Sequence, residues 1–212
     1  MLQMAMFNHP MHIACLDLEG ILVPEVWINV AEHTGIAELR LTTRDISDYD
    51  VLMKRRIQLL WQNGLKLADI QAVIRKMAPL DGAYGFVQAL RRAAQVIVLS
   101  DTFVQFAQPL MEMLDWPTLF CNTLIVDGSG MVKDYVLRQP DGKCRAVAAL
   151  KSLGFTTLAV GDSYNDIGML EEADHPYLFR PPAQIVEQYP HFPAVHDHDE
   201  LLELLRGQFE QG

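Results

Sequence analysis

The chain has 212 residues, and 27 acidic against 17 basic residues give it a formal net charge of −10 at pH 7. This length suffices for one hydrophobic core with a modest insertion, and the acidic balance argues against nucleic acid or an anionic membrane as a partner. No apolar run approaches the roughly 20 residues of a membrane span, and three cysteines without a CxxC pair argue against a disulfide framework or a structural zinc site. We therefore expect a globular protein of the reducing cytoplasm.

The first apolar run is followed by two carboxylates. Residues 1–10 contain no Lys or Arg and no long apolar core, so we predict a poorly ordered extension rather than a signal peptide. Ile13–Leu16 is short and apolar without alternation, which is typical of a buried strand. Asp17 and Glu19 come next, and their spacing places both side chains on one face while the chain stays extended. Two like charges so close need a divalent cation or a shared proton, and a carboxylate beside such a cation can attack phosphorus.

Residues 24–79 show helical periodicity and no β-rich run. Three helical patterns begin near Val26, Leu52 and Leu67, and they stop near Gly35, near Gly64 and before Pro79. A turn-rich piece, residues 42–49, separates the first two. We predict a small helical cap domain at residues 24–79, inserted into a core domain of residues 11–23 and 80–212.

Strands and helices alternate after the insertion. Helix is predicted around Phe86–Leu90, over Phe103–Leu114, from Lys143, from Met169 and over Leu201–Phe209; strand is predicted at Val96–Leu99, Thr157–Val160, Tyr177–Phe179 and Ala194–Val195, with a hairpin turning at Asp127–Gly130. This order predicts a doubly wound, Rossmann-like α/β fold with helices on both faces of a parallel sheet. Ligands bind beyond the carboxyl ends of such strands, and Asp17, Ser100 and Asp162 all follow a predicted strand directly.

Four motifs occur together in the order of a known family. They are Asp17-Leu18-Glu19-Gly20 after the first strand, Ser100-Asp101-Thr102 after the second, Lys143 at the start of a helix, and Gly161-Asp162-Ser163-Tyr164-Asn165-Asp166 after the third. Over roughly residues 12–180 the chain resembles the haloacid dehalogenase-like hydrolases. Within them it resembles the phosphoserine phosphatase branch, and most closely its bifunctional members, which also transfer the phosphoryl group from phosphoserine to homoserine. Those members carry Glu at the position of Glu19, where most of the wider family carries Asp.

The resemblance implies roles for the acidic residues. Asp17 would be the nucleophile that forms an aspartyl-phosphate, and Glu19 would be the general acid and then the general base. Asp17, the main-chain carbonyl of Glu19, and Asp162 would bind Mg²⁺, with Asp166 in support. Each has a simpler alternative, because acids are also common as solvated groups at strand ends, in turns and at helix N-termini.

The remaining candidates would bind substrate. Ser100 and the amide of Asp101 would hold phosphoryl oxygens at a strand-to-helix turn; the alternative is that Ser100 or Thr102 is a plain N-cap. Lys143 would pair with the phosphate, with Lys151 as its rival on the same helix, and Asn165 would bind phosphate or only support its turn. The resemblance further implies that Glu25 binds the substrate amino group and Arg56 its carboxylate; a solvated basic face around Arg56 is the alternative.

We thus predict a Mg²⁺-dependent phosphatase of O-phospho-L-serine that also uses homoserine as acceptor. The alternatives are a phosphatase of another small phosphomonoester, such as a sugar phosphate or nucleotide, and a receiver-like module that is phosphorylated without turnover. The substrate is a small molecule in either enzyme, and the sequence is compatible with a homodimer.

Overall fold

The computed structural model describes residues 11–42, 45–46 and 48–209, so the prediction for residues 1–10 and part of the predicted turn at 42–49 lie outside the described residues. The strands are β1 (Met11–Leu16), β2 (Gln95–Phe103), β3 (Thr118–Val126), β4 (Val132–Val136), β5 (Phe155–Gly161), β6 (His175–Phe179) and β7 (Ala194–Val195). The helices are α1 (Val26–Thr34), α2 (Tyr49–Gln62), α3 (Leu67–Ile74), α4 (Ala83–Arg91), α5 (Val104–Met113), α6 (Gly142–Ser152), α7 (Ile167–Glu172), α8 (Ala183–Gln188) and α9 (His198–Phe209), with short 3₁₀ turns η1 (Ala37–Arg40) and η2 (Tyr164–Asp166).

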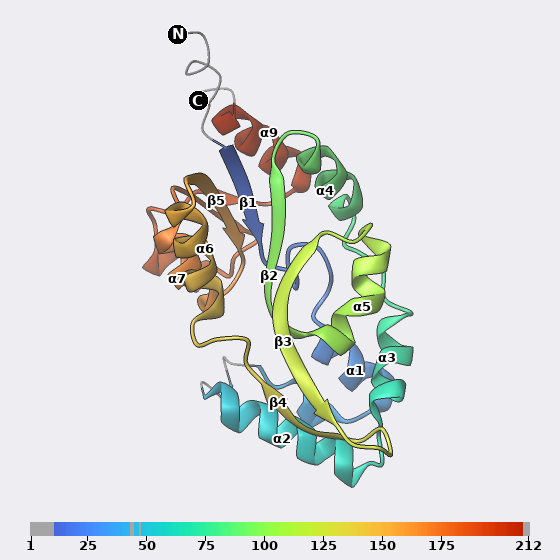
Figure 1. The fold of residues 1–212 in the computed structure, drawn as a ribbon. Coiled ribbons are helices and arrows are strands. Elements are labelled where there is room, and N and C mark those ends of the chain that lie inside the picture. Colours follow the sequence, from blue (N-terminus) through green and yellow to red (C-terminus); the bar gives the residue numbers. More distant parts are fainter. Residues whose placement is uncertain (1–10, 43–44, 47, 210–212) are drawn as a thin grey trace, which may run out of the picture.

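The strands form one sheet in the order β4-β3-β2-β1-β5-β6-β7 (Figure 1). Every neighbouring pair is parallel except β3 and β4, which form the predicted antiparallel hairpin. The doubly wound parallel sheet predicted from the sequence is confirmed. Among helices in the described part of the chain, none combines the length and apolarity that crossing a membrane requires.

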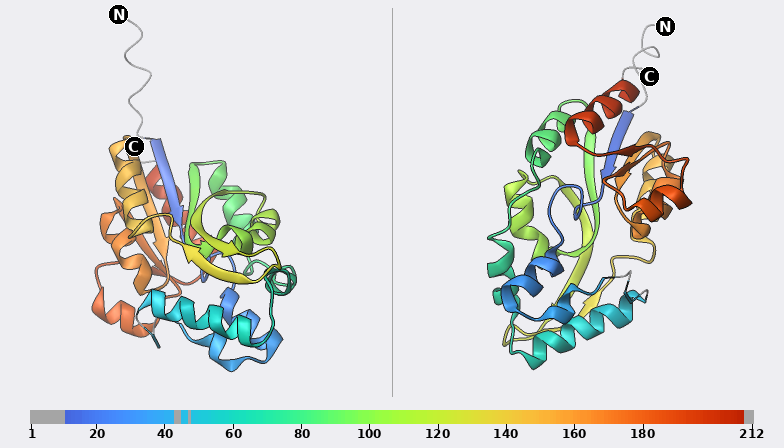
Figure 2. Two further views of the ribbon diagram at one scale, coloured as in Figure 1. Left: turned by 60° about the horizontal axis from the view of Figure 1, so that its bottom comes forward. Right: turned by 180° about the vertical axis from the view of Figure 1, so that it is seen from behind.

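Side chains of β1 alternate between two hydrophobic cores, one on each face of the sheet. Ala14 and Leu16 pack into the core that α1, α3, α4, α5 and α9 complete, whereas Ile13 and Cys15 pack with α6, α7 and α8. Figures 1 and 2 show α4 and α5 on the opposite side of the sheet from α6 and α7. Because both faces are covered, the run from Ile13 to Leu16 is apolar throughout, and the chain can present polar groups only where β1 ends.

Helices α1–α3 lie beyond the carboxyl end of β1 (Figure 1). They contact the β3–β4 hairpin, because Trp61 Nε1 of α2 donates to the carbonyl of Val132 at 2.7 Å and Tyr135 of β4 donates its hydroxyl to Asp50 Oδ1 at 2.8 Å. The amide of Leu67 adds a bond to the carbonyl of Gly130 at 2.9 Å. These bonds hold the helical segment over the edge of the sheet where the predicted site residues lie.

Of the boundaries that differ from the predicted ones, two concern the strands beside the site. Strand β2 continues through Ser100–Thr102, and α5 begins only at Val104 with Phe103 as its N-cap, so Ser100 and Thr102 are neither a strand-to-helix turn nor N-caps. Strand β3 begins at Thr118, six residues before the predicted hairpin arm. Its first half was missed because Asn122 interrupts the apolar pattern, although this Asn is buried within the sheet.

Candidate active site

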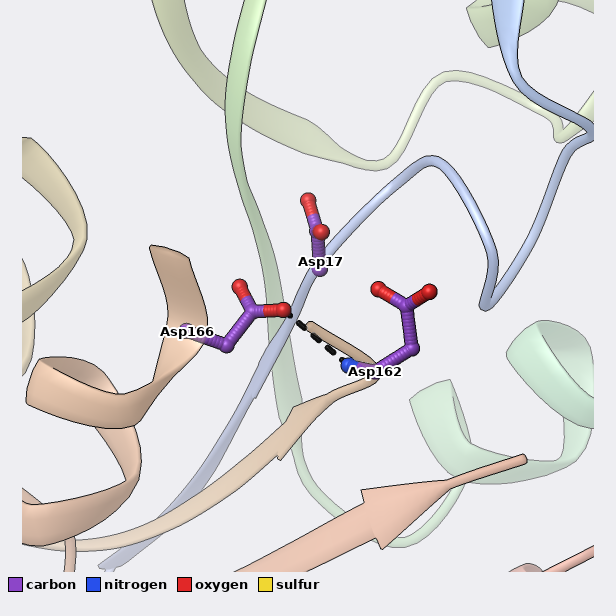
Figure 3. Close-up of side chains that lie close together, drawn as sticks. All are labelled: Asp17, Asp162 and Asp166. Carbon is purple, nitrogen blue, oxygen red and sulfur yellow. Dashed lines mark hydrogen bonds between the residues drawn. The ribbon is translucent and has the colours of Figure 1, made fainter. Parts of the chain in front are cut away.

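Three carboxylates meet at the carboxyl edge of the sheet. Asp17 follows β1, and its amide donates to the carbonyl of Val160 at 2.9 Å, which continues the pairing of β1 with β5. Asp162 and Asp166 follow β5, and one carboxylate oxygen from each of the three residues lies within 4.8 Å of the others (Figure 3). Asp166 Oδ2 also accepts the amide of Asp162 at 3.0 Å, which fixes the turn after β5. Main-chain bonds therefore hold the carboxylates together despite their repulsion.

Lys143 supplies the positive charge of this cluster. It stands in the first turn of α6, with its ammonium 2.8 Å from Asp17 Oδ1 and 2.7 Å from Asp166 Oδ1. Burial alone would lower the pKa of Lys143, but the charges of Asp166 and Asp17 outweigh it and hold the pKa well above its usual range. The rival Lys151 points elsewhere and bonds to the carbonyl of Glu172 at 2.7 Å. Of the two lysines, only Lys143 is part of the site.

One ammonium does not neutralise three carboxylates. The pKa of Asp17 is raised well above its usual range by burial and by the charge of Asp166, even though Lys143 acts in the opposite direction. Burial and Asp166 also raise the pKa of Asp162 to about 7. The excess negative charge and the all-oxygen donor set fit a hard divalent cation such as Mg²⁺.

Gly20 leaves room beside this cluster. Its φ is +80°, and a Cβ built on it would lie 2.4 Å from Asp162 Oδ2, so a side chain here would both strain the backbone and displace the carboxylate. The residue after Glu19 is therefore fixed as glycine by the close approach of Asp162.

Glu19 does not share the position of Asp17. Its carboxylate is not a member of the three-carboxylate cluster, and Oε2 instead accepts the amide of Val26 at 2.8 Å. The two acids were expected on one face, but the chain is extended only as far as Leu16 and turns at Gly20. Burial and the charge of Glu25 raise the pKa of Glu19 to about 8. A carboxyl with this pKa carries a proton at neutral pH and can give it to a leaving group.

Arg56 and Glu25 line the same cavity as Asp17 and Lys143, and its volume is about 1330 Å³. Arg56 is only 7% exposed and lies over the ring of Trp27, with 4.7 Å between its Cζ and the ring centroid. Its Nη2 donates to the carbonyl of Leu41 at 2.7 Å, whereas its buried Nε has no hydrogen-bond partner among the described residues. Burial lowers the pKa of Arg56 to about 10, so the guanidinium remains charged at neutral pH. The solvated basic face considered for Arg56 is excluded by its burial.

The predicted phosphate-binding residues occupy the end of β2 and the turn after β5. Ser100 is buried, and its Oγ accepts the amide of Thr102 at 3.2 Å. Asn165 is exposed, and its side-chain amide donates to Asp101 Oδ2 at 3.0 Å, so it joins the turn after β5 to the end of β2.

The polar residues of this cavity that were not predicted include two that share one hydrogen-bond acceptor. Tyr49 and Asn122 both donate to the main-chain carbonyl of Asp101, at 3.0 Å and 3.1 Å respectively. The buried Asn within a run of strand-forming residues was the available signal for Asn122, but Tyr49 has no signal in the sequence because its partner lies 52 residues away.

Comparisons with known proteins agree with this geometry. The profile of the haloacid dehalogenase-like hydrolases matches residues 11–174. The chain is 58% identical over 189 residues to the phosphoserine phosphatase of Pseudomonas syringae pv. tomato, covering 89% of this chain and 80% of that protein. It is 55% identical to phosphoserine phosphatase ThrH of Pseudomonas aeruginosa, covering 90% and 93% respectively. Among solved structures, a phosphoserine phosphatase from T. onnurineus in complex with NDSB-201 superimposes with a TM-score of 0.73 at 25% identity, covering 95% of this chain and 98% of that one.

Proposed function

Because the chain belongs to the haloacid dehalogenase-like hydrolases, we propose that it hydrolyses O-phospho-L-serine through a phosphorylated Asp17 and requires Mg²⁺. The observation that carries this proposal is the cavity that joins two kinds of group. Asp17 and Lys143 line it together with Arg56 and Glu25, so it offers a nucleophile and a phosphate partner as well as groups for an amino acid. A receiver-like module needs no such second set of groups.

In the first step a carboxylate oxygen of Asp17 bonds to phosphorus while the bond from phosphorus to the serine oxygen breaks. Glu19 donates its proton to the leaving serine oxygen. In the second step Glu19 takes a proton from water, whose oxygen attacks phosphorus and releases Asp17 and inorganic phosphate. Lys143 stabilises the charge that develops on the phosphoryl oxygens, and Ser100 with the amide of Asp101 holds them in place.

The three carboxylates provide a site for Mg²⁺. Asp17, Asp162 and the main-chain carbonyl of Glu19 would bind the ion, with Asp166 in support; the bound ion lowers the repulsion between the Asp17 carboxylate and the phosphate. Without it, two anions would have to meet beside a carboxylate cluster in which Lys143 is the cation that contacts Asp17 and Asp166.

The amino-acid part of the substrate would lie against the helical segment, which we interpret as a cap domain at residues 24–79. Arg56 would bind the substrate carboxylate through its guanidinium, and Glu25 would bind the ammonium group. A cap over this cavity would shield the reacting groups from bulk water and would favour small substrates. Homoserine carries the same carboxylate and ammonium groups as serine, so we further propose that it replaces water as acceptor in the second step.

The test is a phosphate-release assay with Mg²⁺ on O-phospho-L-serine, glucose 6-phosphate and adenosine 5′-monophosphate, repeated with homoserine while O-phosphohomoserine is followed by ³¹P NMR. We expect phosphoserine to be preferred, and Asp17→Asn or EDTA to abolish turnover. Faster release from the sugar phosphate or the nucleotide would exclude the amino-acid assignment. Full turnover by Asp17→Asn would exclude the mechanism, and failure to form O-phosphohomoserine would exclude only the transfer.

A further inference from the structure

The main-chain carbonyl of Asp101 accepts two side-chain hydrogen bonds from elements that are far apart in the sequence. Tyr49, the first residue of α2, donates its hydroxyl at 3.0 Å, and Asn122 of β3 donates its amide at 3.1 Å. This carbonyl is accessible to both because the pairing of β2 with β3 is irregular here. Leu99 pairs with Phe120 and the next pair is Phe103 with Asn122, so the ladder skips Ser100–Thr102.

Fixing this carbonyl also fixes the amide on the other side of the same peptide bond. The peptide unit is planar and trans, so the carbonyl of Asp101 and the N–H of Thr102 point in opposite directions. That N–H donates to Ser100 Oγ at 3.2 Å in a buried environment. Because Ser100 Oγ accepts this bond, its own hydrogen remains available to donate to another acceptor. The orientation of one peptide plane thus sets the direction of the Ser100 hydroxyl.

We infer that Tyr49 is a positioning residue, which couples the helical segment to the phosphate grip through the Asp101–Thr102 peptide. By phosphate grip we mean the Ser100 hydroxyl and the Asp101 amide, which are proposed to hold the phosphoryl oxygens. The inference rests on the proposed function, in which Ser100 binds phosphoryl oxygens. It makes phosphate affinity depend on α2, although the groups proposed to bind the phosphate, Ser100, Asp101 and Lys143, lie outside the helical segment. Asn122 holds the same carbonyl from the sheet, so the grip is weakened rather than lost when α2 moves away.

Two further observations support a donor role for Tyr49. Burial, together with the charge of Asp101, holds the pKa of Tyr49 well above its usual range, so its hydroxyl stays protonated over the working pH range. The ring is also held in place, because Tyr135 packs against it edge to face with 5.7 Å between centroids and 86° between planes. Because the ring is already fixed, the side chain of Tyr49 loses little further conformational entropy when its hydroxyl donates this hydrogen bond.

Tyr135 provides a matched control. Its hydroxyl also joins the helical segment to the sheet, by donating to Asp50 Oδ1 at 2.8 Å, but none of its described contacts is to Asp101. Tyr49→Phe and Tyr135→Phe each remove one hydroxyl that crosses between α2 and the sheet. If the inference is correct, only Tyr49→Phe should weaken phosphate binding. If these hydroxyls merely attach the helical segment to the sheet, both variants should weaken it.

The experiment measures the Kd of inorganic phosphate by calorimetry with Mg²⁺ present, together with kcat and KM for phosphoserine. For Tyr49→Phe we expect the phosphate Kd and the KM to rise about fivefold, from the loss of one neutral hydrogen bond. Tyr135→Phe should stay within about twofold of the unsubstituted protein in both quantities, well below the loss of a full hydrogen bond. In a Ser100→Ala background, Tyr49→Phe should have little further effect, because the hydroxyl through which Tyr49 acts is already gone.

Three results would overturn the inference. The first is an unchanged phosphate Kd in Tyr49→Phe, and the second is an equal rise of the phosphate Kd in Tyr135→Phe. The third is a double variant, Ser100→Ala with Tyr49→Phe, whose rise in phosphate Kd equals the product of the rises in the two single variants. The phosphate Kd does not depend on which ester is the substrate. A protein that binds phosphate as expected but leaves phosphoserine intact would therefore refute the proposed function and leave the inference standing.

Discussion

Replacing Lys143 by Met should show how strongly the repulsion between the site carboxylates destabilises the folded protein. The ammonium lies 2.8 Å from Asp17 and 2.7 Å from Asp166, and its side chain is 6% exposed. Met fills a similar volume but leaves the two carboxylates without their cation. Removing one partner from a buried ion pair costs about 3–5 kcal/mol, which is a large part of the total stability of a typical domain. We expect the free energy of unfolding to fall by this amount when divalent cations are removed.

Mg²⁺ should restore part of this loss, because a ligand that binds only the folded state stabilises it. A free concentration 100 times the Kd contributes about 2.7 kcal/mol. Loss of the ammonium also removes a charge that repels the ion from the carboxylates. The difference in stability between Lys143→Met and the unsubstituted protein should therefore be smaller with Mg²⁺ than with EDTA.

The measurement is urea unfolding followed by circular dichroism, in EDTA and in Mg²⁺. Lys151→Met is the matched control, because Lys151 lies on the same helix but its side chain is 34% exposed, and its ion pair with Asp174 is 3.3 Å long. Partly exposed pairs contribute about 1 kcal/mol or less. Two results would contradict this reasoning. They are an equal loss of stability by the two variants in EDTA, and a stability difference between Lys143→Met and the unsubstituted protein that is the same in Mg²⁺ as in EDTA.

Three further substitutions test separate parts of the structure. Arg56→Lys should raise the KM for phosphoserine about tenfold with little change in phosphate Kd, because Lys lacks the planar fork; an unchanged KM contradicts a carboxylate-binding role. Gly20→Ala should weaken Mg²⁺ binding more than about tenfold in a calorimetric titration, because the new Cβ would meet Asp162 Oδ2 at 2.4 Å, and native affinity would show that the loop adjusts freely. Burial alone would raise the pKa of Asp174, but two bonds from Thr157 together with the ammonium of Lys151 lower it, so the contribution of Asp174 is present above its unfolded pKa and is lost as pH falls through the folded value. Asp174→Asn should cost about 1 kcal/mol at pH 7 by urea unfolding, and the cost should shrink below about pH 4; a difference independent of pH would be inconsistent with this charge.

The convergence of Asp17, Ser100 and Asp162 could be predicted from sequence because it follows from topology. Parallel strands end at one edge of the sheet, so residues that follow three such strands meet whatever the details of packing. Lys143 could be preferred over Lys151 for the same reason, since it begins its helix at that edge. These predictions needed only the type and order of the elements, which are strongly encoded where apolar runs are short and buried.

The contacts made between elements could not be predicted in this way. Glu19 leaves the face of Asp17 because the chain turns at Gly20, whose φ is +80°. A glycine permits such a turn, but the approach of Asp162, which excludes a side chain there, is a contact between distant residues that no local pattern specifies. The bond from Tyr49 to Asp101 depends on where α2 lies over the sheet, which no local pattern specifies. Asn122 was missed for a related reason, since a polar residue in a strand has meaning only when its partner in space is known.

The residues of the site come from two parts of the chain, which differ in the contacts that fix their positions. The proposed nucleophile Asp17, Lys143 and the acidic cluster lie at the edge of a sheet that is packed on both faces. Arg56 and Tyr49 instead come from α2, and Glu25 precedes α1, in a segment attached to that sheet by hydrogen bonds to the β3–β4 hairpin. Substitutions in the helices can therefore change which phosphomonoester fits without moving the groups that react with phosphorus. Tyr49 is the exception, since its hydroxyl reaches Asp101 on the sheet, and it is the contact through which a change in the helices would alter phosphate binding itself.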